Sequence, residues 1–485
     1  MNDLRHAGVA AIAFSLLLTA CGGNSHGAWS SDSDDDEAPM APTNIAGNAG
    51  DGAVSLGWDA PTTGSSPLTY SITIAPAAAT ATITRDGTHA LIRGLANNTT
   101  YTFSVTAKND AGESTAATLA LKPIAASSDY DNFSVIARDS NDNNSPTGIF
   151  DPSLLTLNGT VWMAYSSVNY YQQSGRRVQD VSTSLAYSND GGANFTYLRT
   201  IGLPSSATVT PTTVNPCGNV TCTGRWVYEV PFLVEDKTDP DSSKRFKLFA
   251  HKYFLYPPAD NSTIYPVGAI VMWTAPSPDS NWSSERVVLG WNATPQQLST
   301  TNNVNSLNAA LSTCLALSEG SATAYQDNLD FAFACSDGDT QKIVMLRSTD
   351  HASTFNYVGT PLEAADAAAF NADYFSAPAL IPTESSAPLL IATPVIINRP
   401  ISGLPLPTNA YSGCVAFPLA DEETGKLFRS SSTPLSIWQI DSKTNHLSGA
   451  CAWDRGANSS GVLINDIDAS SNTPQFRILK TAKTF

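Results

Sequence analysis

Charged residues are scarce in this chain. Of its 485 residues only 14% are charged, and 43 acidic residues against 26 basic ones give a formal net charge of −17. A surface that binds nucleic acid must neutralise phosphates with lysine and arginine, so this balance argues against nucleic acid as a partner. The acidity itself is consistent with a soluble surface and indicates nothing more specific.

The sequence also lacks the signatures of several enzyme classes. It contains no Walker phosphate loop, no Rossmann glycine pattern, no His-Glu-x-x-His helix and no Gly-x-Ser-x-Gly elbow. Only six histidines are present, and no two cysteines are spaced as Cys-x-x-Cys, which argues against a zinc site. We therefore predict no metal and no cofactor. Structural calcium at an acidic run remains an unsupported alternative.

One apolar run stands out because long apolar runs are otherwise missing. Ala7–Leu18 is too short to span a bilayer permanently. Its last residue, Leu18, is also the first residue of the sequence Leu-Thr-Ala-Cys-Gly. This segment resembles a bacterial lipoprotein signal peptide with its lipobox. The resemblance implies that residues 1–20 are removed and that Cys21 carries the lipid. Because Gly22 is not aspartate, it further implies the outer membrane or cell surface of a Gram-negative bacterium. An ordinary secretory signal is the alternative.

The six remaining cysteines suit an exported protein. Sequence alone does not fix how six cysteines pair. Neighbouring pairs are favoured, because each pair flanks a hairpin-like segment. The predicted disulfides are Cys217–Cys222, Cys314–Cys335 and Cys414–Cys451.

The abundance of Gly, Pro, Ser, Thr and Asn predicts many short strands joined by turns, and therefore an all-β protein. Residues 21–40 are polar and include the acidic run Ser30–Glu37, which predicts a flexible tether behind the lipid. Two folded domains follow, at residues 41–124 and 130–485.

The first of these domains has alternating strands and a characteristic corner. Val54–Trp58 and Leu68–Ile74 alternate apolar and polar residues, and Leu95 leads into the strand Thr99–Asn109 through Tyr101. These features resemble a fibronectin type III domain, which implies a β-sandwich. In exported proteins the resemblance implies a spacer or a weak adhesion module, with the spacer favoured.

A repeated turn marks the second domain. Ser188–Phe195 and Ser348–Phe355 both read Ser-x-Asp, then an aromatic residue five positions after the Asp, and each lies between strand-like runs. The carboxylate can accept backbone N–H groups across a hairpin, and glycine permits positive φ. The pattern resembles the Asp-box of sialidase-like β-propellers. The second copy has Ala352 where the first has Gly192.

Strand-like runs recur in fours from residue 150 to the C-terminus, as a ring of four-stranded sheets requires. We predict a β-propeller with five blades favoured and six as the alternative; two β-sandwiches are a further alternative. The last set lacks an outer strand, which Phe133–Ala137 could supply beside Phe476–Leu479 and so close the ring.

Ligands of propellers bind near the axis, where the innermost strands begin. Three successive sets place a carboxylate there: Asp151, Glu229 and Glu319. This arrangement resembles five-bladed glycosidases of the furanosidase type. The resemblance implies that Asp151 is the base or nucleophile and Glu319 the general acid, with Glu229 in the place of a middle aspartate. The implied chemistry is glycoside hydrolysis by two carboxylates.

The Asp-box pattern raises a sialidase alternative. Its acid/base would be Asp180, shortly before the first turn, and its nucleophile Tyr374. Sialidases carry an arginine on the first strand to bind the substrate carboxylate, whereas this chain has Phe150-Asp151-Pro152.

We predict further glycan contacts by aromatic, basic and acidic side chains, namely Tyr170, Tyr171, Arg176, Trp226 and Asp454. The sequence thus favours a surface-anchored glycoside hydrolase acting on extracellular glycans, held at the membrane through Cys21. A non-catalytic carbohydrate-binding or adhesion lipoprotein and an exo-sialidase are the alternatives, so enzymatic activity itself stays open.

Overall fold

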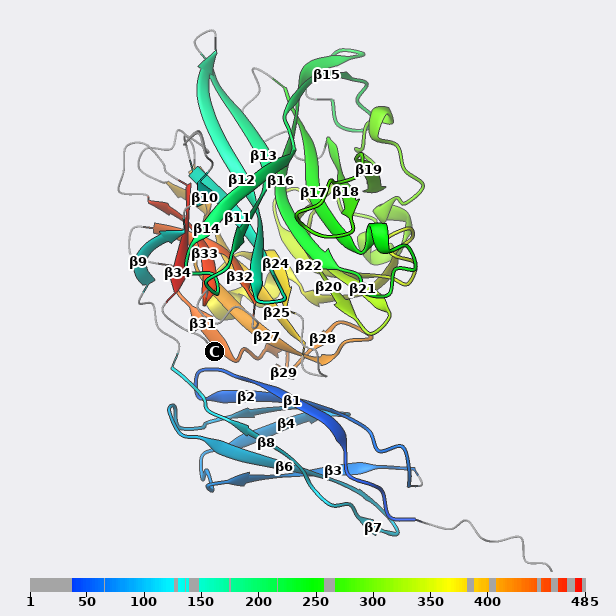
Figure 1. Cartoon of the computed structure of the whole chain (residues 1–485), viewed down its shortest axis with the longest axis vertical. Coiled ribbons are helices and arrows are strands. Elements are labelled where there is room, and N and C mark those ends of the chain that lie inside the picture. Colours follow the sequence, from blue (N-terminus) through cyan, green and yellow to red (C-terminus); the bar gives the residue numbers. More distant parts are fainter. Residues whose placement is uncertain are drawn as a thin grey trace, which may run out of the picture.

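The computed structural model describes two β domains, a small sandwich and a larger body above it (Figure 1). The described residues are 37–64, 66–125, 130–135, 137–138, 148–173, 176–215, 217–256, 267–381, 388–400, 407–442, 446–454, 461–468 and 476–481. The signal peptide, Cys21 and nearly all of the acidic tether lie outside them.

The small domain is the expected β-sandwich. One sheet contains β1 (Thr43–Ala49), β2 (Ala53–Asp59), β5 (His89–Arg93) and β4 (Thr82–Asp86). The other contains β3 (Thr69–Ala75), β6 (Tyr101–Asn109), β7 (Gly112–Glu113) and β8 (Ala117–Leu121). Trp58 is buried between them against Tyr70, and the Tyr101 hydroxyl accepts the Ala96 N–H at 3.1 Å across the predicted corner.

The large domain is a β-propeller built from successive antiparallel sheets. The first contains β11 (Gly148–Leu157), β12 (Thr160–Gln173), β13 (Arg176–Ser188) and β14 (Phe195–Gly202), with β10 (Ala137–Arg138) beside β14. The second contains β16 (Cys222–Glu235), β17 (Phe246–Leu255), β18 (Gly268–Ala275) and β19 (Arg286–Leu289), with β15 (Ser205–Val209) beside β16. The third contains β20 (Ala316–Tyr325), β21 (Asn328–Ser336), β22 (Gln341–Ser348) and β23 (Asn356–Leu362).

Two more sheets complete the succession. The fourth contains β24 (Tyr374–Ile381), β25 (Leu389–Pro400) and β27 (Cys414–Asp421), flanked by β26 (Pro407–Tyr411), β28 (Lys426–Leu427) and β31 (Trp438–Ile440). The fifth contains β32 (His446–Trp453), β33 (Val462–Asp468) and β34 (Phe476–Thr481). These strand sets are referred to below as blades, numbered in chain order.

The two ends of the large domain meet in the fifth sheet. β9 (Tyr130–Val135) pairs antiparallel with β34, so that Val135 lies opposite Ile478. Gly148 also pairs with Phe476, which links the first sheet to the last. A strand from the start of the domain therefore supplies the outer strand that the last set lacks.

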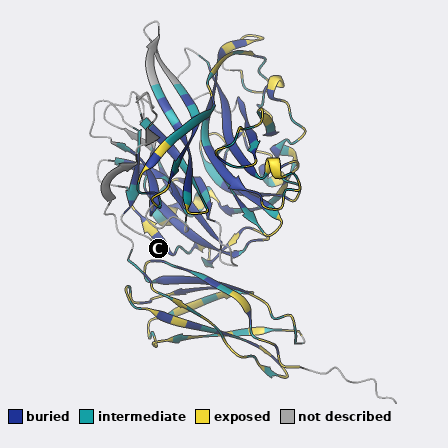
Figure 2. Ribbon diagram, in the orientation of Figure 1, coloured by how far each residue is buried: buried dark blue, intermediate teal, exposed yellow. Residues whose placement is uncertain are grey.

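Helix among the described residues is confined to short 3₁₀ turns, and none is long and apolar enough to cross a membrane. They are η1 (Ser242–Lys244), η3 (Gln296–Leu298), η4 (Val304–Ser306), η5 (Ala309–Leu311) and η6 (Ala364–Phe370). A small hairpin of β29 (Arg429–Ser430) and β30 (Thr433–Pro434) follows β28. Figure 2 shows that buried residues concentrate in the strands of the propeller.

The three predicted disulfides are present as Cys217–Cys222, Cys314–Cys335 and Cys414–Cys451. The first closes a loop before β16, and the second ties the segment before β20 to β21. The third joins β27 to β32 and therefore links the fourth sheet covalently to the fifth.

The sandwich packs directly on the propeller. The Asp51 N–H donates to the Ile437 carbonyl at 2.7 Å, and Lys426 forms an ion pair with Asp86. Ala53 and Leu91 of the sandwich belong to the same buried apolar cluster as the outer part of the fourth sheet. A Cβ on Gly50 would lie 2.2 Å from the Ile437 carbonyl oxygen, so this close approach requires glycine. The sandwich is therefore docked on the fourth sheet.

The two repeated turns form the same hydrogen bonds. Asp190 Oδ1 accepts the N–H groups of Ala193 and Asn194 at 3.0 and 2.9 Å, and Ser188 Oγ accepts that of Gly192 at 2.9 Å. These contacts hold the pKa of Asp190 well below its usual range, chiefly through the Asn194 and Ser188 side chains.

The second turn repeats this set with its own residues. Asp350 Oδ1 accepts the N–H groups of Ser353 and Thr354, and Ser348 Oγ accepts that of Ala352 at 2.9 Å. His351 and Ala352 adopt φ values of 60° and 64°, the positive region that favours glycine. The serine and aspartate contacts therefore hold the turn even where glycine is missing.

We expect Ser348→Ala to lower the free energy of unfolding by about 1–3 kcal/mol, because it leaves the buried Ala352 N–H without its acceptor. Urea unfolding measures the change. Ser353→Ala, at an exposed position of the same turn, is the control and should stay within about 0.5 kcal/mol of the wild type. Equal stability of both variants would contradict the role of the Ser348 hydroxyl.

Candidate functional site

The innermost strand of every sheet is interrupted by one bulge at a corresponding place. Strand pairing shifts register between Phe150 and Ser153 in β11, and corresponding shifts occur in β16, β20, β24 and β32. At each bulge one non-glycine residue has a φ between 43° and 53°: Asp151, Val230, Glu319, Ala377 and Ala450. Positive φ is costly for such residues, and strain of this kind concentrates at functional sites.

These five bulge residues, hereafter the bulge ring, line one cavity on the propeller axis. The cavity has a volume of about 690 Å³ and is lined by residues from β11, β16, β20, β24 and β32. Two members of the ring are acidic, Asp151 and Glu319, whereas the other three are aliphatic. The ring thus brings two of the three predicted catalytic carboxylates to one place.

Asp151 is almost completely buried, with 6% of its surface exposed. Asn465 of β33 holds it at two points: Asn465 Oδ1 accepts the Asp151 N–H at 2.9 Å, and Asn465 Nδ2 donates to Asp151 Oδ1 at 3.0 Å. Ser166 of β12 donates to Asp151 Oδ2 at 2.8 Å. Burial and then the charge of Glu319 raise the pKa of Asp151 to about 7, against these hydrogen bonds.

Glu319 is half-buried and accepts hydrogen bonds on both oxygens. Ser376 Oγ donates to Glu319 Oε2 at 2.5 Å, and the Tyr411 hydroxyl donates to Oε1. Ser376 lies just before the bulge of the fourth sheet, and Tyr411 ends β26 of the same sheet. Both oxygens of the Glu319 carboxyl group are therefore fixed by hydroxyl groups of the fourth sheet.

Glu229 does not take the third place that the sequence predicts for it. The bulge of β16 puts Val230 in the ring, and Glu229 precedes it, paired with His251 of β17. Glu229 is not among the residues that line the cavity. The prediction was one residue out of register, because a bulge shifts the alternation of side chains by one.

The residues of the sialidase alternative also lie away from the cavity lining. Asp180 forms a two-point ion pair with Arg225, with N–O distances of 2.8 and 3.0 Å. Tyr374 is buried at the start of β24 and is 3% exposed. The hydroxyl of another tyrosine, Tyr411, donates to a carboxylate of the bulge ring.

The predicted glycan contacts divide into three groups. Trp226 is buried, with its ring centroid 5.2 Å from that of Phe254, so its indole belongs to the core and the prediction is corrected. Asp454 lines the cavity at the end of the fifth inner strand. The side chains of Tyr170, Tyr171 and Arg176 lie outside the described residues; their backbone belongs to the long hairpin of β12 and β13 where a loop was expected.

Ser166 and Asn465, which hold Asp151, were not predicted, and neither was their counterpart Thr393. All three are polar, have no exposed surface and lie on the second strands of their sheets. That combination is a usable signal, because a buried polar side chain requires a hydrogen-bond partner. Proline is a second signal: it directly follows the bulge residue in Asp151-Pro152, Val230-Pro231 and Ala377-Pro378. Proline inside a strand marks a bulge or an edge.

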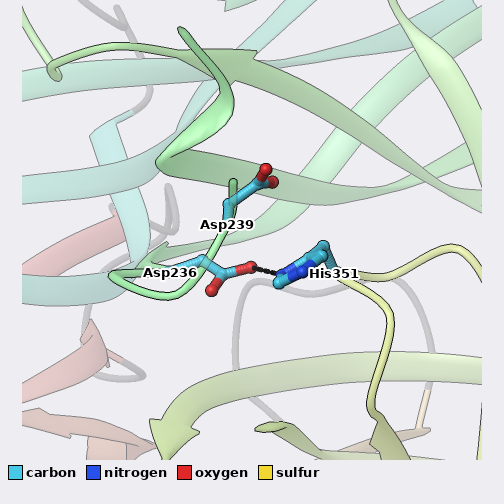
Figure 3. A group of neighbouring side chains, drawn as sticks. All are labelled: Asp236, Asp239 and His351. Atoms are coloured by element: carbon cyan, nitrogen blue, oxygen red, sulfur yellow. Dashed lines mark hydrogen bonds and ion pairs between the residues drawn. The ribbon is translucent and has the colours of Figure 1, made fainter. Parts of the chain in front are cut away.

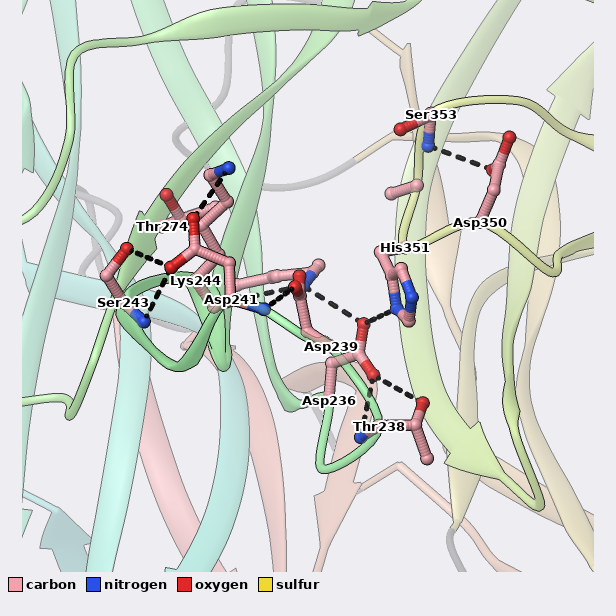
Figure 4. Close-up of polar contacts among 12 residues, drawn as sticks. Asp236, Thr238, Asp239, Asp241, Ser243, Lys244, Thr274, Asp350, His351 and Ser353 are labelled. Carbon is pink, nitrogen blue, oxygen red and sulfur yellow. Dashed lines mark hydrogen bonds and ion pairs between the residues drawn. The ribbon is translucent and has the colours of Figure 1, made fainter. Parts of the chain in front are cut away.

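A separate acidic cluster joins the second and third sheets. Asp236, Asp239 and His351 bring potential metal-ligating atoms within 4.8 Å of one another (Figure 3). His351 Nδ1 lies 2.9 Å from Asp236 Oδ2, and the cluster continues through Thr238, Asp241 and Lys244 (Figure 4).

A lysine already supplies the positive charge of this cluster. Lys247 is 1% exposed, and its ammonium lies 3.0 Å from Asp236 Oδ2 and 2.6 Å from Asp239 Oδ2. Burial alone would raise the pKa of Asp236, but hydrogen bonds from Lys247 and His351 keep it below its usual value. A metal ion would have to displace this ammonium, so the cluster is best explained as a buried ion pair within the second sheet, which His351 of the third sheet contacts.

Comparison with known proteins identifies the sandwich. Residues 40–122 match the model of the fibronectin type III domain. A curated relative, chitinase A1 of Niallia circulans, is 43% identical over 88 residues, which are 18% of this chain and 12% of that protein. The match thus spans about an eighth of the relative's length.

Solved structures similar to this chain include glycoside hydrolases. The catalytic domain of a GH62 α-L-arabinofuranosidase from Coprinopsis cinerea has a TM-score of 0.40 at 10% identity, covering 72% of this chain and 95% of that chain. A family 117 glycoside hydrolase from Zobellia galactanivorans has a TM-score of 0.40 at 11% identity, covering 73% of this chain and 92% of that chain. TM-scores this low transfer no residue role, so the chemistry must be argued from the site itself.

We expect Lys247→Met to lower the free energy of unfolding by about 3–5 kcal/mol, because it leaves Asp236 and Asp239 buried without their cation. Lys244→Met is the control, since its ion pair with Asp241 is exposed and screened by solvent, so this substitution should change the free energy of unfolding little. Chemical denaturation measures both. If calcium restored the loss in Lys247→Met but did not affect the wild type, the same pocket would accept a metal once the lysine is gone.

The raised pKa of Asp151 predicts a pH-dependent stability. The unfolded chain ionises Asp151 near its ordinary pKa of 3.8, whereas the folded protein keeps the proton to about pH 7. The stabilising contribution of the neutral form is therefore full below pH 4 and lost as the pH rises to 7. Asp151→Asn cannot ionise at this position. Its free energy of unfolding, relative to that of the wild type, should therefore rise by up to about 4 kcal/mol between pH 4 and pH 8.

Urea unfolding at four or five pH values tests this prediction. Asp327→Asn, at an exposed position after β20, is the control and should follow the pH dependence of the wild type. Parallel curves for wild type and Asp151→Asn would contradict a protonated Asp151.

Proposed function

We propose that this protein is a glycoside hydrolase that acts through Asp151 and Glu319. The observation that carries the proposal is that both carboxylates belong to one bulge ring, where the charge of Glu319 and burial raise the pKa of Asp151 to about 7. Hydrolysis of a glycosidic bond by two carboxylates requires one protonated and one ionised group at the same pH. This pair meets that requirement near neutral pH.

The proton rests on Asp151 in the free protein. Asp151 is the more deeply buried of the two, and Glu319 is stabilised as an anion by the hydroxyls of Ser376 and Tyr411. Asp151 is then the general acid that protonates the leaving oxygen, and Glu319 is the base or nucleophile. These roles are the reverse of those that the furanosidase resemblance implies.

The substrate class we propose is an extracellular glycan, reached from the outer membrane or cell surface through a lipid on Cys21. The Leu-Thr-Ala-Cys sequence after an apolar run supports the anchor, and three disulfides support an oxidising compartment. The exo-sialidase alternative has less support, because the one cationic side chain among the described cavity-lining residues is Lys237 and none of them is arginine.

Substitution of either carboxylate tests the proposal. A panel of aryl glycosides and polysaccharides first identifies a turned-over substrate, and Asp151→Asn and Glu319→Gln should then each lower kcat/KM by at least about a thousandfold. Glu229→Gln is the matched control outside the bulge ring and should retain most of the activity. Full activity in Asp151→Asn or Glu319→Gln would refute the assignment. Glycan binding without turnover would favour the non-catalytic alternative, which the aliphatic Val230, Ala377 and Ala450 of the ring also suit.

The same variants separate the two roles. A dinitrophenyl glycoside has a leaving group that departs without a proton, so loss of the general acid should matter far less for it. We expect Asp151→Asn to recover much of its activity on that substrate, and Glu319→Gln to remain inactive unless azide is added as a small nucleophile or base. The opposite result would assign the acid to Glu319.

A further inference from the structure

One polar contact repeats between neighbouring blades. A side chain on the second strand of one sheet accepts the backbone N–H of the bulge residue in the next sheet. Ser166 Oγ accepts from Val230 at 3.0 Å, Thr393 Oγ1 from Ala450 at 2.7 Å, and Asn465 Oδ1 from Asp151 at 2.9 Å.

The three acceptors are structurally equivalent. Each lies opposite the residue that precedes the bulge in its own sheet, through the pairs Phe150–Ser166, Ser376–Thr393 and Gly449–Asn465. A bulge leaves a backbone N–H without a partner in the strand ladder, and a buried N–H group must be satisfied elsewhere. A short polar side chain meets this need in the first, fourth and fifth sheets, whereas the equivalent residues of the second and third sheets are His251 and Ala334.

Asn465 differs from the other two in what it does beyond that requirement. Its amide nitrogen also donates to Oδ1 of Asp151 at 3.0 Å, so one side chain hydrogen-bonds both the backbone and the carboxyl group of the same residue. The amide has no freedom to flip, because the reversed orientation would point an N–H at the N–H of Asp151. Ser166 also combines two contacts, accepting from Val230 and donating to Oδ2 of Asp151, but these lie on two different residues.

We propose that Asn465 is a positioning residue that keeps Oδ1 of Asp151 occupied as an acceptor, so that Oδ2 is the oxygen that carries the proton. This inference rests on the function proposed above for Asp151. A proton on Oδ1 would collide with the amide hydrogen of Asn465, whereas Oδ2 faces the hydroxyl of Ser166, which can either donate or accept. Asn465 therefore selects the proton-bearing oxygen of the acid.

The matched pair Asn465→Asp and Thr393→Val tests the proposal. Asn465→Asp keeps an acceptor for the backbone N–H but replaces the amide donor with a second carboxylate. Thr393→Val removes the equivalent backbone acceptor in the fourth sheet and touches no carboxylate. Thr393→Val therefore removes the repeated backbone contact and alters no carboxyl group, whereas Asn465→Asp keeps that contact and alters the donor to the carboxyl group of Asp151.

The titration of Asp151 is the readout that a merely structural role would not move. It is followed by the carbon NMR signal of labelled aspartate in the full chain, assigned by its loss in Asp151→Asn. We expect Asn465→Asp to raise the titration midpoint by at least about one pH unit, and Thr393→Val to leave it within about 0.3. An unchanged midpoint in Asn465→Asp, or an equal shift in Thr393→Val, would overturn the proposal.

Two further measurements keep the outcome interpretable. If Asn465→Asp does not fold by circular dichroism, Asn465→Ser replaces it, since serine also loses the donor without adding charge. If the wild type turns over a glycoside, both Asn465 variants should lose at least about tenfold in kcat with little change in KM, and the pH profile should move with the titration. A shifted titration in a protein without turnover would uphold the positioning role and refute the glycosidase.

Discussion

The backbone bulge in each innermost strand is the constraint on which the rest of this structure depends. It forces five non-glycine residues to positive φ, at a cost of about 1–3 kcal/mol each, and turns them toward one axis. Everything distinctive about the site follows from that geometry. Two ring members are acidic, three second strands supply buried polar acceptors, and two of those acceptors, Ser166 and Asn465, also bond the carboxyl group of Asp151.

The two acidic members of the bulge ring, Asp151 and Glu319, differ in their surroundings. They share a cavity, but Asp151 is enclosed by its own blade and the fifth, whereas Glu319 is half-buried and receives hydroxyls from the fourth. A shared environment with different donors is a way to separate the protonation states of two like groups. Away from the axis, Lys247 neutralises a second acidic pair, so that buried charge within the second blade serves cohesion.

Much of this organisation could be predicted from the sequence, and the failures share one cause. Strand alternation and turn chemistry are local, so the sandwich, the sheets, the disulfide pairs, Asp151 and Glu319 were all accessible. Glu229 was misplaced because a bulge changes register by one residue, which alternation alone does not reveal. The proline after Val230 was the local sign that was overlooked.

Tyr411 and Asn465 could not have been assigned in that way. Each contacts its carboxylate from another blade, and no local pattern encodes which blades become neighbours. Trp226 illustrates the converse difficulty, since an indole in a strand can stack on a sugar or fill a core, and burial decides between them.

The ring closure also determines when the site can exist. Asp151 and Asn465 are separated by 314 residues, and the fifth sheet needs β9 from the start of the domain beside β34 near the chain end. Contacts of such separation form late, after the intervening chain has closed a very long loop. A chain whose fifth sheet has not yet formed would therefore present Asp151 as a solvated aspartate without its Asn465 contacts. The buried environment of this carboxyl group thus arises only when the propeller closes.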